Sequence, residues 1–346
     1  MSDTPASDRV SRAWLIDSHA QIWRAWHGAD KAMVDAENRP VGAVQGFADS
    51  LLNLLESVFG THLASPVAIH PEQGPIVACA FDAPCGRGFR QSIYPDYKAH
   101  RPPAPEDLKA QLPRCRQLAE AAGLMAIDFP GYEADDVIGT LATRLRGRAR
   151  AITIITGDKD LAQLLGPDDR WFNPMRQIVL AYGDVERRYG VKPTQIADWL
   201  ALTGDTADNI PGVPGIGPRI AGNLLKKHGT IDGIYANLAA VYGMKFRGAP
   251  RAQKLLAEHE PLVRLSRKLT GIVCDLPLEQ LPAPWMGIRP DLPDLLRAAG
   301  VDEGRIARWT RLPRAPSPPD GEPLTADLSA MTTGMPHRHE LAPVSR

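Results

Sequence analysis

Nine acidic residues recur at positions where a folded chain could bring carboxylates together. Asp17, Asp82 and Asp158 each follow a short apolar run. Carboxylate oxygens without cysteine or histidine beside them are hard ligands that select Mg²⁺ or Mn²⁺ over zinc. So many anions can share a site only if cations neutralise them. The nine candidate metal ligands are Asp17, Asp82, Glu133, Asp135, Asp136, Asp158, Asp160, Asp205 and Asp208.

Each of these acids taken alone has a simpler interpretation as a helix cap, a turn residue or a solvated surface group. Three independent acids after apolar runs, together with the cluster at residues 133–136, make that interpretation poor for the set. The spacing by itself therefore indicates a divalent-metal site in an α/β protein.

The apolar runs in front of these acids predict the elements that position them. Continuous apolar runs of this length, separated by helical patterns, are typical of buried parallel strands. The alternation predicts an α/β fold with a mostly parallel central sheet flanked by helices, in which functional groups gather at the carboxyl ends of the strands. We expect strands at residues 13–16, 76–81 and 151–156 and helices at 44–59, 114–122, 134–146, 194–203, 219–228, 252–269 and 292–299.

Composition limits the class of protein. The chain has 346 residues with 40 Lys and Arg against 40 Asp and Glu, so its net charge is zero. This length suggests about two domains. Four widely spaced cysteines without a CxxC motif argue against a disulfide framework and a zinc site. No signal peptide or membrane-length apolar run is visible, so we expect a cytoplasmic protein.

Two basic segments interrupt this neutral balance. Residues 85–116 carry seven Lys or Arg against three acids, and residues 209–254 carry seven against one. Either segment could be an ordinary solvated face. In the second segment Gly212, Gly215 and Gly217 precede a predicted helix. Glycines there allow backbone N–H groups to approach a phosphate, although an ordinary helix–helix turn has the same pattern.

A series of motifs in chain order resembles the 5′ nuclease, or flap endonuclease, superfamily, and is most similar to the 5′–3′ exonuclease domain of bacterial DNA polymerase I. The resemblance implies a PIN-like core, a helical arch and a C-terminal helix–three-turn–helix domain. The motifs are Phe81-Asp82, Phe89-Arg90, Tyr97-Lys98, Arg101-Pro102-Pro103 and the segments at residues 131–136, 156–163 and 204–217.

The resemblance implies roles for single residues. It places one metal near Asp17, Asp82, Glu133 and Asp135 or Asp136, and a second near Asp158, Asp160, Asp205 and Asp208. Two Mg²⁺ ions, replaceable by Mn²⁺, would hydrolyse a phosphodiester bond, and a K⁺ ion could bind in the hairpin. The residues implied to act beside the metals are Lys98, Arg101 and Arg90, and those implied to contact DNA are Tyr97, Gly212, Gly215, Gly217, Arg219, Lys226 and Lys227. Tyr97 has an equally simple interpretation as a packed core residue.

The expected organisation follows from the same motifs. We divide the chain into a flexible N-terminus at 1–12, an α/β metallonuclease domain at 13–183 with its arch at about 84–130, a helical duplex-binding domain at 184–312 with the helix–three-turn–helix at about 204–229, and a disordered proline-rich tail at 313–346. With no polymerase domain in the sequence, we expect a stand-alone protein.

The expected function is that of a structure-specific 5′–3′ exonuclease and flap endonuclease. Its partners would be 5′ flaps, nicks and ends of DNA, bound without sequence preference, and an RNA primer in a hybrid, during replication or repair. We expect a monomer in the bacterial cytoplasm, associated with the nucleoid and not with a membrane. Two alternatives stay open: a catalytically silent DNA-binding protein and a PIN-type ribonuclease. Departures from the family pattern occur at Ser18 and at residues 84–88.

Overall fold

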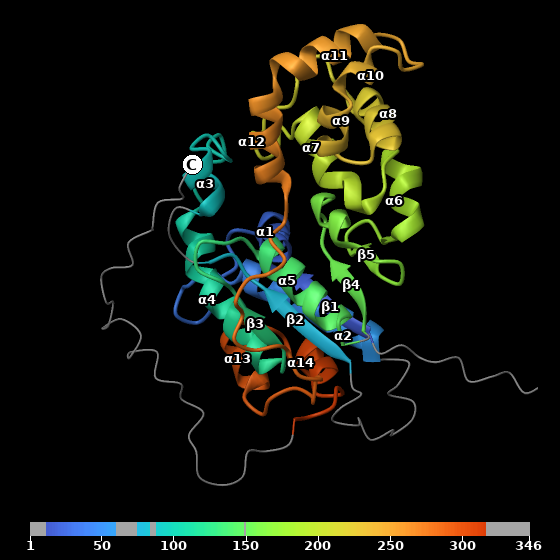
Figure 1. Ribbon diagram of the computed structural model, residues 1–346. Helices are drawn as coiled ribbons and strands as arrows, with labels where there is room; N and C mark the ends of the chain where they lie inside the picture. The colour runs from blue at the N-terminus through green and yellow to red at the C-terminus, as the bar shows by residue number, and fades with distance from the viewer. Residues whose placement is uncertain (1–11, 60–74, 84–87, 149, 316–346) are drawn as a thin grey trace, which may run out of the picture. The chain divides into compact units, whose positions relative to one another are not determined.

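A computed structural model describes residues 12–59, 75–83, 88–148 and 150–315 (Figure 1). The expected flexible N-terminus, nearly all of the expected disordered tail and most of the departure at residues 84–88 lie outside the described residues. The described chain up to Ala315 belongs to one compact unit. None of its helices is long and apolar enough to cross a membrane.

A six-stranded sheet forms the centre of the fold, in the order β3-β2-β1-β4-β5-β6. The three strands expected from apolar runs are β1, β2 and β4, and β1 pairs in parallel with both of the others. Their carboxyl ends therefore meet at one edge. Only β6 runs antiparallel to its neighbour. The strands span β1 (Arg12–Asp17), β2 (Ile76–Ala80), β3 (Met125–Ile127), β4 (Ala151–Ile155), β5 (Arg170–Asn173) and β6 (Ile178–Ala181).

The sheet separates two apolar cores, because alternate residues of a strand point to opposite faces. Ile76 and Ala78 of β2 belong to the core that contains helix α5 (Ala134–Arg146). Val77 and Cys79 belong to a second core. This second core also takes in residues of α2 (Gly42–Phe59) and α4 (Glu106–Ala121). α1 (Ser18–Gly28) packs beside α2 and α4, and the short α3 (Phe89–Ile93) comes between β2 and α4 in the chain.

The helices after β6 largely follow the expected positions. The helix expected at 252–269 is two helices, α11 and α12, because Pro261 lacks the N–H of a helix interior and stands at the start of the second. The elements are the 3₁₀ turns η1 (Asp160–Leu164) and η2 (Pro193–Gln195) and the helices α6 (Tyr182–Tyr189), α7 (Ile196–Thr203), α8 (Pro218–His228), α9 (Ile231–Ala236), α10 (Leu238–Val241), α11 (Ala249–Glu258), α12 (Glu260–Thr270), α13 (Leu292–Ala298) and α14 (Glu303–Trp309).

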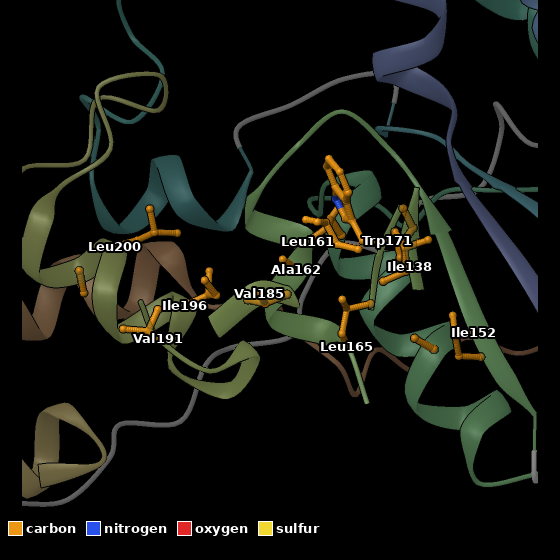
Figure 2. Packing of buried hydrophobic residues seen from close by; sticks show 14 of the residues in the cluster. Ile138, Ile152, Leu161, Ala162, Leu165, Trp171, Val185, Val191, Ile196 and Leu200 are labelled. Atoms are coloured by element: carbon orange, nitrogen blue, oxygen red, sulfur yellow. The ribbon is translucent and has the colours of Figure 1, made fainter. Parts of the chain in front are cut away.

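The first core continues across the expected domain boundary at residue 183. Leu161, Leu165 and Trp171, from the α/β part, and Val185 and Ile196, from the helical part, belong to one buried cluster (Figure 2). The helices α6 and α7 therefore pack on the sheet layer through a shared apolar core.

The last two helices belong to the sheet layer and not to the helical region, which differs from the expected domain at 184–312. Trp309 of α14 is fully buried in the second core, together with residues of α2 and α4. Arg305 forms an ion pair with Asp49 of α2 at 3.0 Å. The chain thus returns to the sheet after α12, and the amphipathic pattern alone could not show which layer these helices cover.

Candidate metal centre

Asp17 is held at the carboxyl end of the central strand. It ends β1 and caps α1, where its Oδ1 accepts a hydrogen bond from the Ala20 N–H at 3.1 Å. Its Oδ2 accepts from the Thr156 hydroxyl at 2.7 Å. Ser18, one of the departures from the family pattern, is buried in the first turn of α1 and does not need a glycine conformation.

Asp82 and the start of α5 meet at the same edge. Asp82 Oδ1 accepts a hydrogen bond from the Ala134 N–H at 2.8 Å, which joins the end of β2 to the helix N-terminus. The His19 Nε2 atom lies 3.5 Å from Asp82 Oδ2. The carboxylate of Asp135, the residue after Ala134, makes no hydrogen bond or ion pair among the described residues. It interacts electrostatically with Asp158, Asp17 and Glu133, and with Lys98 in the opposite sense.

Asp136 faces away from this cluster, which corrects its assignment as a metal ligand. Its carboxylate is fully buried and accepts hydrogen bonds from both terminal nitrogens of Arg90, at 2.7 and 2.8 Å. Its remaining lone pairs accept from the Val273 and Glu133 N–H groups. With all its oxygens engaged, Asp136 has no capacity for an ion.

Arg90 is corrected by the same contact. Its side chain is 4% exposed, and it also donates to the carbonyl oxygens of Leu269 and Gly271 at 2.9 Å each. A guanidinium with its donors in use inside the protein cannot reach a substrate phosphate. Arg90 instead ties α3, α5 and the chain after α12 together.

A second group of carboxylates surrounds Lys159. Lys159 Nζ donates to Asp205 Oδ2 at 2.6 Å and lies 3.2 Å from Asp160 Oδ1. Asp158, directly before it, accepts at Oδ1 from the Asp160 N–H at 2.9 Å. The sequence predictions did not include Lys159, although its place between two acids of the 156–163 motif could have drawn attention to it.

Lys98 and Arg101, in the segment expected to form the arch, lie against acids of both expected metal sites. Lys98 Nζ donates to Glu133 Oε1 at 2.8 Å and lies 3.7 Å from Asp208 Oδ2. Arg101 donates to Asp208 Oδ1 at 2.6 Å. Both cations expected at the metal site thus lie against expected metal ligands.

Tyr97 is a buried network residue, which corrects its assignment as a DNA contact. It is 3% exposed, and its hydroxyl lies 3.0 Å from Glu133 Oε2 and 2.9 Å from Asp208 Oδ2. Burial, followed by these two carboxylates, raises the pKa of Tyr97, so the hydroxyl stays a donor. A ring inside the protein has no face on which a base could stack.

Burial raises the pKa of three carboxylates at this edge. Burial, opposed by two hydrogen bonds and then aided by neighbouring acids, raises the pKa of Asp17 to about 6. Burial and the charge of Asp158 raise the pKa of Asp160 to about 7. The pKa of Asp135 is raised well above its ordinary value, again by burial first and by Asp158 next. The charges of Lys98 near Asp135 and of Lys159 near Asp160 act in the opposite direction but do not offset these causes.

The donor set fits hard divalent cations in its chemistry. The eight remaining acids surround the same edge through the contacts above and all offer oxygen. Asp17 and Asp135 have no lysine or arginine contact among the described residues. Among the described residues, no group of three or more acidic, histidine or cysteine side chains is arranged so that it could hold a metal ion as the structure stands. The match to Mg²⁺ or Mn²⁺ is therefore one of donor chemistry and not of geometry.

The glycine-rich joint separates into glycines with different roles. A β-carbon on Gly212 would lie 2.2 Å from the Thr203 carbonyl carbon, so Gly212 permits close backbone packing. Gly215 has φ +92°, a conformation that favours glycine. Gly217 caps α8 and has open space around it. Arg219 lies in the first turn of α8, and Lys226 and Lys227 lie in its last turn; all three are exposed.

Two family descriptions match successive parts of the chain. Residues 12–190 match "5'-3' exonuclease, N-terminal resolvase-like domain", and residues 191–289 match "5'-3' exonuclease, C-terminal SAM fold". The two matched segments meet between residues 190 and 191.

Similar proteins agree with these matches. The chain is 35% identical over 280 residues to a 5'-3' exonuclease of Aquifex aeolicus, covering 81% of this chain and 88% of the relative. It is 34% identical to DNA polymerase I of Rhizobium leguminosarum over 77% of this chain, but spans only 25% of that relative. The fold is similar to that of a bacteriophage T5 flap endonuclease solved with DNA and metal ions, with TM-score 0.56, 19% identity and coverage of 87% and 97% of the two chains.

Proposed function

The chain belongs to the 5′-3′ exonuclease family, and on this premise we propose that it is a divalent-metal-dependent 5′ nuclease that hydrolyses phosphodiester bonds at the 5′ ends and flaps of DNA. The observation that carries the proposal is the set of acids at the sheet edge, among them Asp17 and Asp160 with pKa values raised by burial, and Lys98 and Arg101 beside them.

The proposed chemistry needs no covalent nucleophile from the protein. Two Mg²⁺ ions, replaceable by Mn²⁺, would supply an activated water and stabilise the charge that develops on the phosphate. Asp17, Asp82, Glu133 and Asp135 at the edge of the sheet would hold one ion, and Asp158, Asp160, Asp205 and Asp208 would hold the other. Asp17 is fixed for this purpose by Thr156 and the Ala20 N–H.

Lys98 and Arg101 would stabilise the scissile phosphate once their carboxylate partners bind metal. Both now neutralise Glu133 and Asp208. Lys98 remains charged: burial lowers its pKa, but Glu133 and Asp208 outweigh this and the pKa is raised. A preorganised cation of this kind contributes on the order of 10²–10³ in rate.

Duplex DNA would lie against the helix–three-turn–helix at residues 204–229. Gly217 at the α8 N-terminus and the exposed Arg219, Lys226 and Lys227 support contacts to phosphates, which position a duplex without reading its sequence. We extend the proposal to K⁺ in this hairpin, to RNA primers in hybrids, and to roles in replication and repair.

The test is cleavage of 5′-flap, nicked and blunt duplexes with Mg²⁺. We expect Asp82→Ala and Asp158→Ala to abolish cleavage while duplex affinity stays within several-fold. Asp294→Ala, at an exposed side chain of α13, is the matched control and should cleave normally. Full activity of either site variant would overturn the metal-site assignment. Duplex binding by the wild type without cleavage under Mg²⁺ or Mn²⁺ would favour a catalytically silent DNA-binding protein.

A further inference from the structure

Residues 94–101, which we call the root of the arch, have an unfavourable backbone conformation at Lys98, the cation proposed to act on the phosphate. Lys98 has φ +54°, in the left-handed region that costs a residue with a β-carbon on the order of 1 kcal/mol or more. The segment forms turns and bends only. Contacts from outside the segment must therefore keep Lys98 in place.

These contacts come from the loop at residues 205–210, directly before the glycine-rich turn. The Lys98 N–H donates to the Asp208 carbonyl oxygen at 3.0 Å. In the opposite direction, the Asn209 side-chain amide donates to the Asp96 carbonyl oxygen at 2.7 Å. Asn209 itself has φ +56°, a conformation that asparagine tolerates better than most residues. Lys98 and Asn209, both with positive φ, thus each donate a hydrogen bond to the other's loop.

Most other side-chain contacts between the two segments depend on the Asp208 carboxylate. The carboxylate accepts hydrogen bonds from the Tyr97 hydroxyl at 2.9 Å and from the Arg101 guanidinium at 2.6 Å, and Lys98 Nζ lies 3.7 Å from its Oδ2. A carboxylate that binds metal has fewer lone pairs for these donors. Arg101 also donates to the Ala207 carbonyl oxygen at 3.1 Å, but its side chain is 48% exposed. The Asn209–Asp96 bond uses neither a metal ligand nor a phosphate-binding cation.

We propose that Asn209 is a positioning residue, which holds residues 94–101 against the duplex-binding hairpin and so keeps Lys98 over the scissile phosphate when metals occupy Asp208. The inference rests on the proposed nuclease function. It gives the hairpin a second role: the loop that leads into the duplex clamp also orients a cation of the active site.

Single-turnover cleavage of a 5′-flap substrate at saturating enzyme and Mg²⁺ tests this role. Asn209→Asp keeps the shape and the left-handed tolerance but places a carboxylate oxygen against the Asp96 carbonyl. Asn209→Gly keeps the backbone and deletes the bond. We expect Asn209→Asp to cleave ~10–100-fold more slowly, as for a small misplacement of a catalytic group, and Asn209→Gly to be slowed less. Unchanged duplex affinity and thermal unfolding would show that both variants fold.

A matched control and a double variant separate positioning from general damage. Asn237 donates to the Gly233 carbonyl oxygen within the helical region, so Asn237→Asp makes the same chemical change elsewhere and should cleave at the wild-type rate. Because Asn209 acts through Lys98, adding Asn209→Asp to Lys98→Ala should slow cleavage no further. The inference would be overturned if the double variant cleaved more slowly than Lys98→Ala alone, by the product of the two single effects. It would also be overturned if Asn209→Asp cleaved at the same rate as Asn237→Asp. A wild type without cleavage would overturn the proposed function as well.

Discussion

Single carboxylates at the sheet edge differ in what neutralises them. Glu133, Asp205 and Asp208 each contact a lysine or arginine within 2.8 Å. Asp17 and Asp135 have no cation contact among the described residues, and burial is the largest cause of their raised pKa values. The acids at the site are therefore of two kinds, those paired with a cation and those without one. A divalent ion should stabilise the unpaired acids, Asp17 and Asp135, the most.

The raised pKa values predict how the metal-free protein responds to pH. Folded Asp17 and Asp160, with pKa values of about 6 and about 7, bind protons that the unfolded chain has already lost. Their contribution to the free energy of unfolding is greatest near pH 4 and falls as the pH rises to about 7. The pKa of Asp135 is raised well above its ordinary value by burial and then by Asp158. Asp135→Asn removes this carboxylate, so we expect the variant to be more stable than wild type at pH 7.5, by ~1 kcal/mol or more.

Urea unfolding in a chelator at pH 5 and pH 7.5 measures this difference. The advantage of Asp135→Asn should shrink at pH 5, where the wild-type carboxylates carry protons. Added Mg²⁺ should stabilise the wild type more than the variant. An Asp135→Asn variant that is less stable than wild type at pH 7.5 in chelator would show that the cluster is not short of positive charge.

At the scale of elements, the sequence predicted those whose pattern is local. The runs at 13–16, 76–81 and 151–156 became adjacent strands, and α5 begins where the 133–136 cluster suggested. Residue type could not separate Asp135 from Asp136, because successive helix positions point about 100° apart and only one faces the cluster. Arg90 and Tyr97 were misassigned because burial depends on α12 and on the loop at 205–210, which lie far away in the sequence.

The hairpin around Gly212 is an element whose glycines can be tested against each other. A β-carbon at Gly212 would meet the Gly204 backbone nitrogen at 2.3 Å, whereas one at Gly217 would meet nothing within 4 Å. We expect Gly212→Ala to lower the free energy of unfolding by about 3 kcal/mol or more, because two backbones must separate. Gly217→Ala should change it by less than ~1 kcal/mol. Equal effects in denaturant unfolding would contradict the close packing of these two loops.

For the whole molecule, the zero net charge is a sum of opposed regions. Acids concentrate at the sheet edge, and exposed cations such as Lys226 and Lys227 extend along α8. Their separation lets a neutral chain offer an anionic cluster to metal ions and a cationic surface to phosphates. Affinity for a duplex and the rate of the chemical step should therefore respond to different variants.

The salt dependence of duplex binding measures this division. Replacing both Lys226 and Lys227 by alanine should reduce the slope of log affinity against log salt by roughly 2, one phosphate contact for each lysine. Single-turnover cleavage at saturating enzyme should stay within a few-fold of wild type. Arg297→Ala, in α13 of the sheet layer, should leave the slope unchanged. An unaltered slope in the double variant would place the duplex elsewhere.

The return of α13 and α14 to the sheet layer has a consequence for synthesis of the protein. Trp309 and Leu312 complete a core whose other residues begin at Ile16, so that core closes only when nearly the whole described chain has been made. Contacts between such distant parts of a sequence slow folding and leave apolar surface exposed meanwhile. A nascent chain released before α14 would therefore carry every residue of the metal centre and still depend on chaperones to stay soluble.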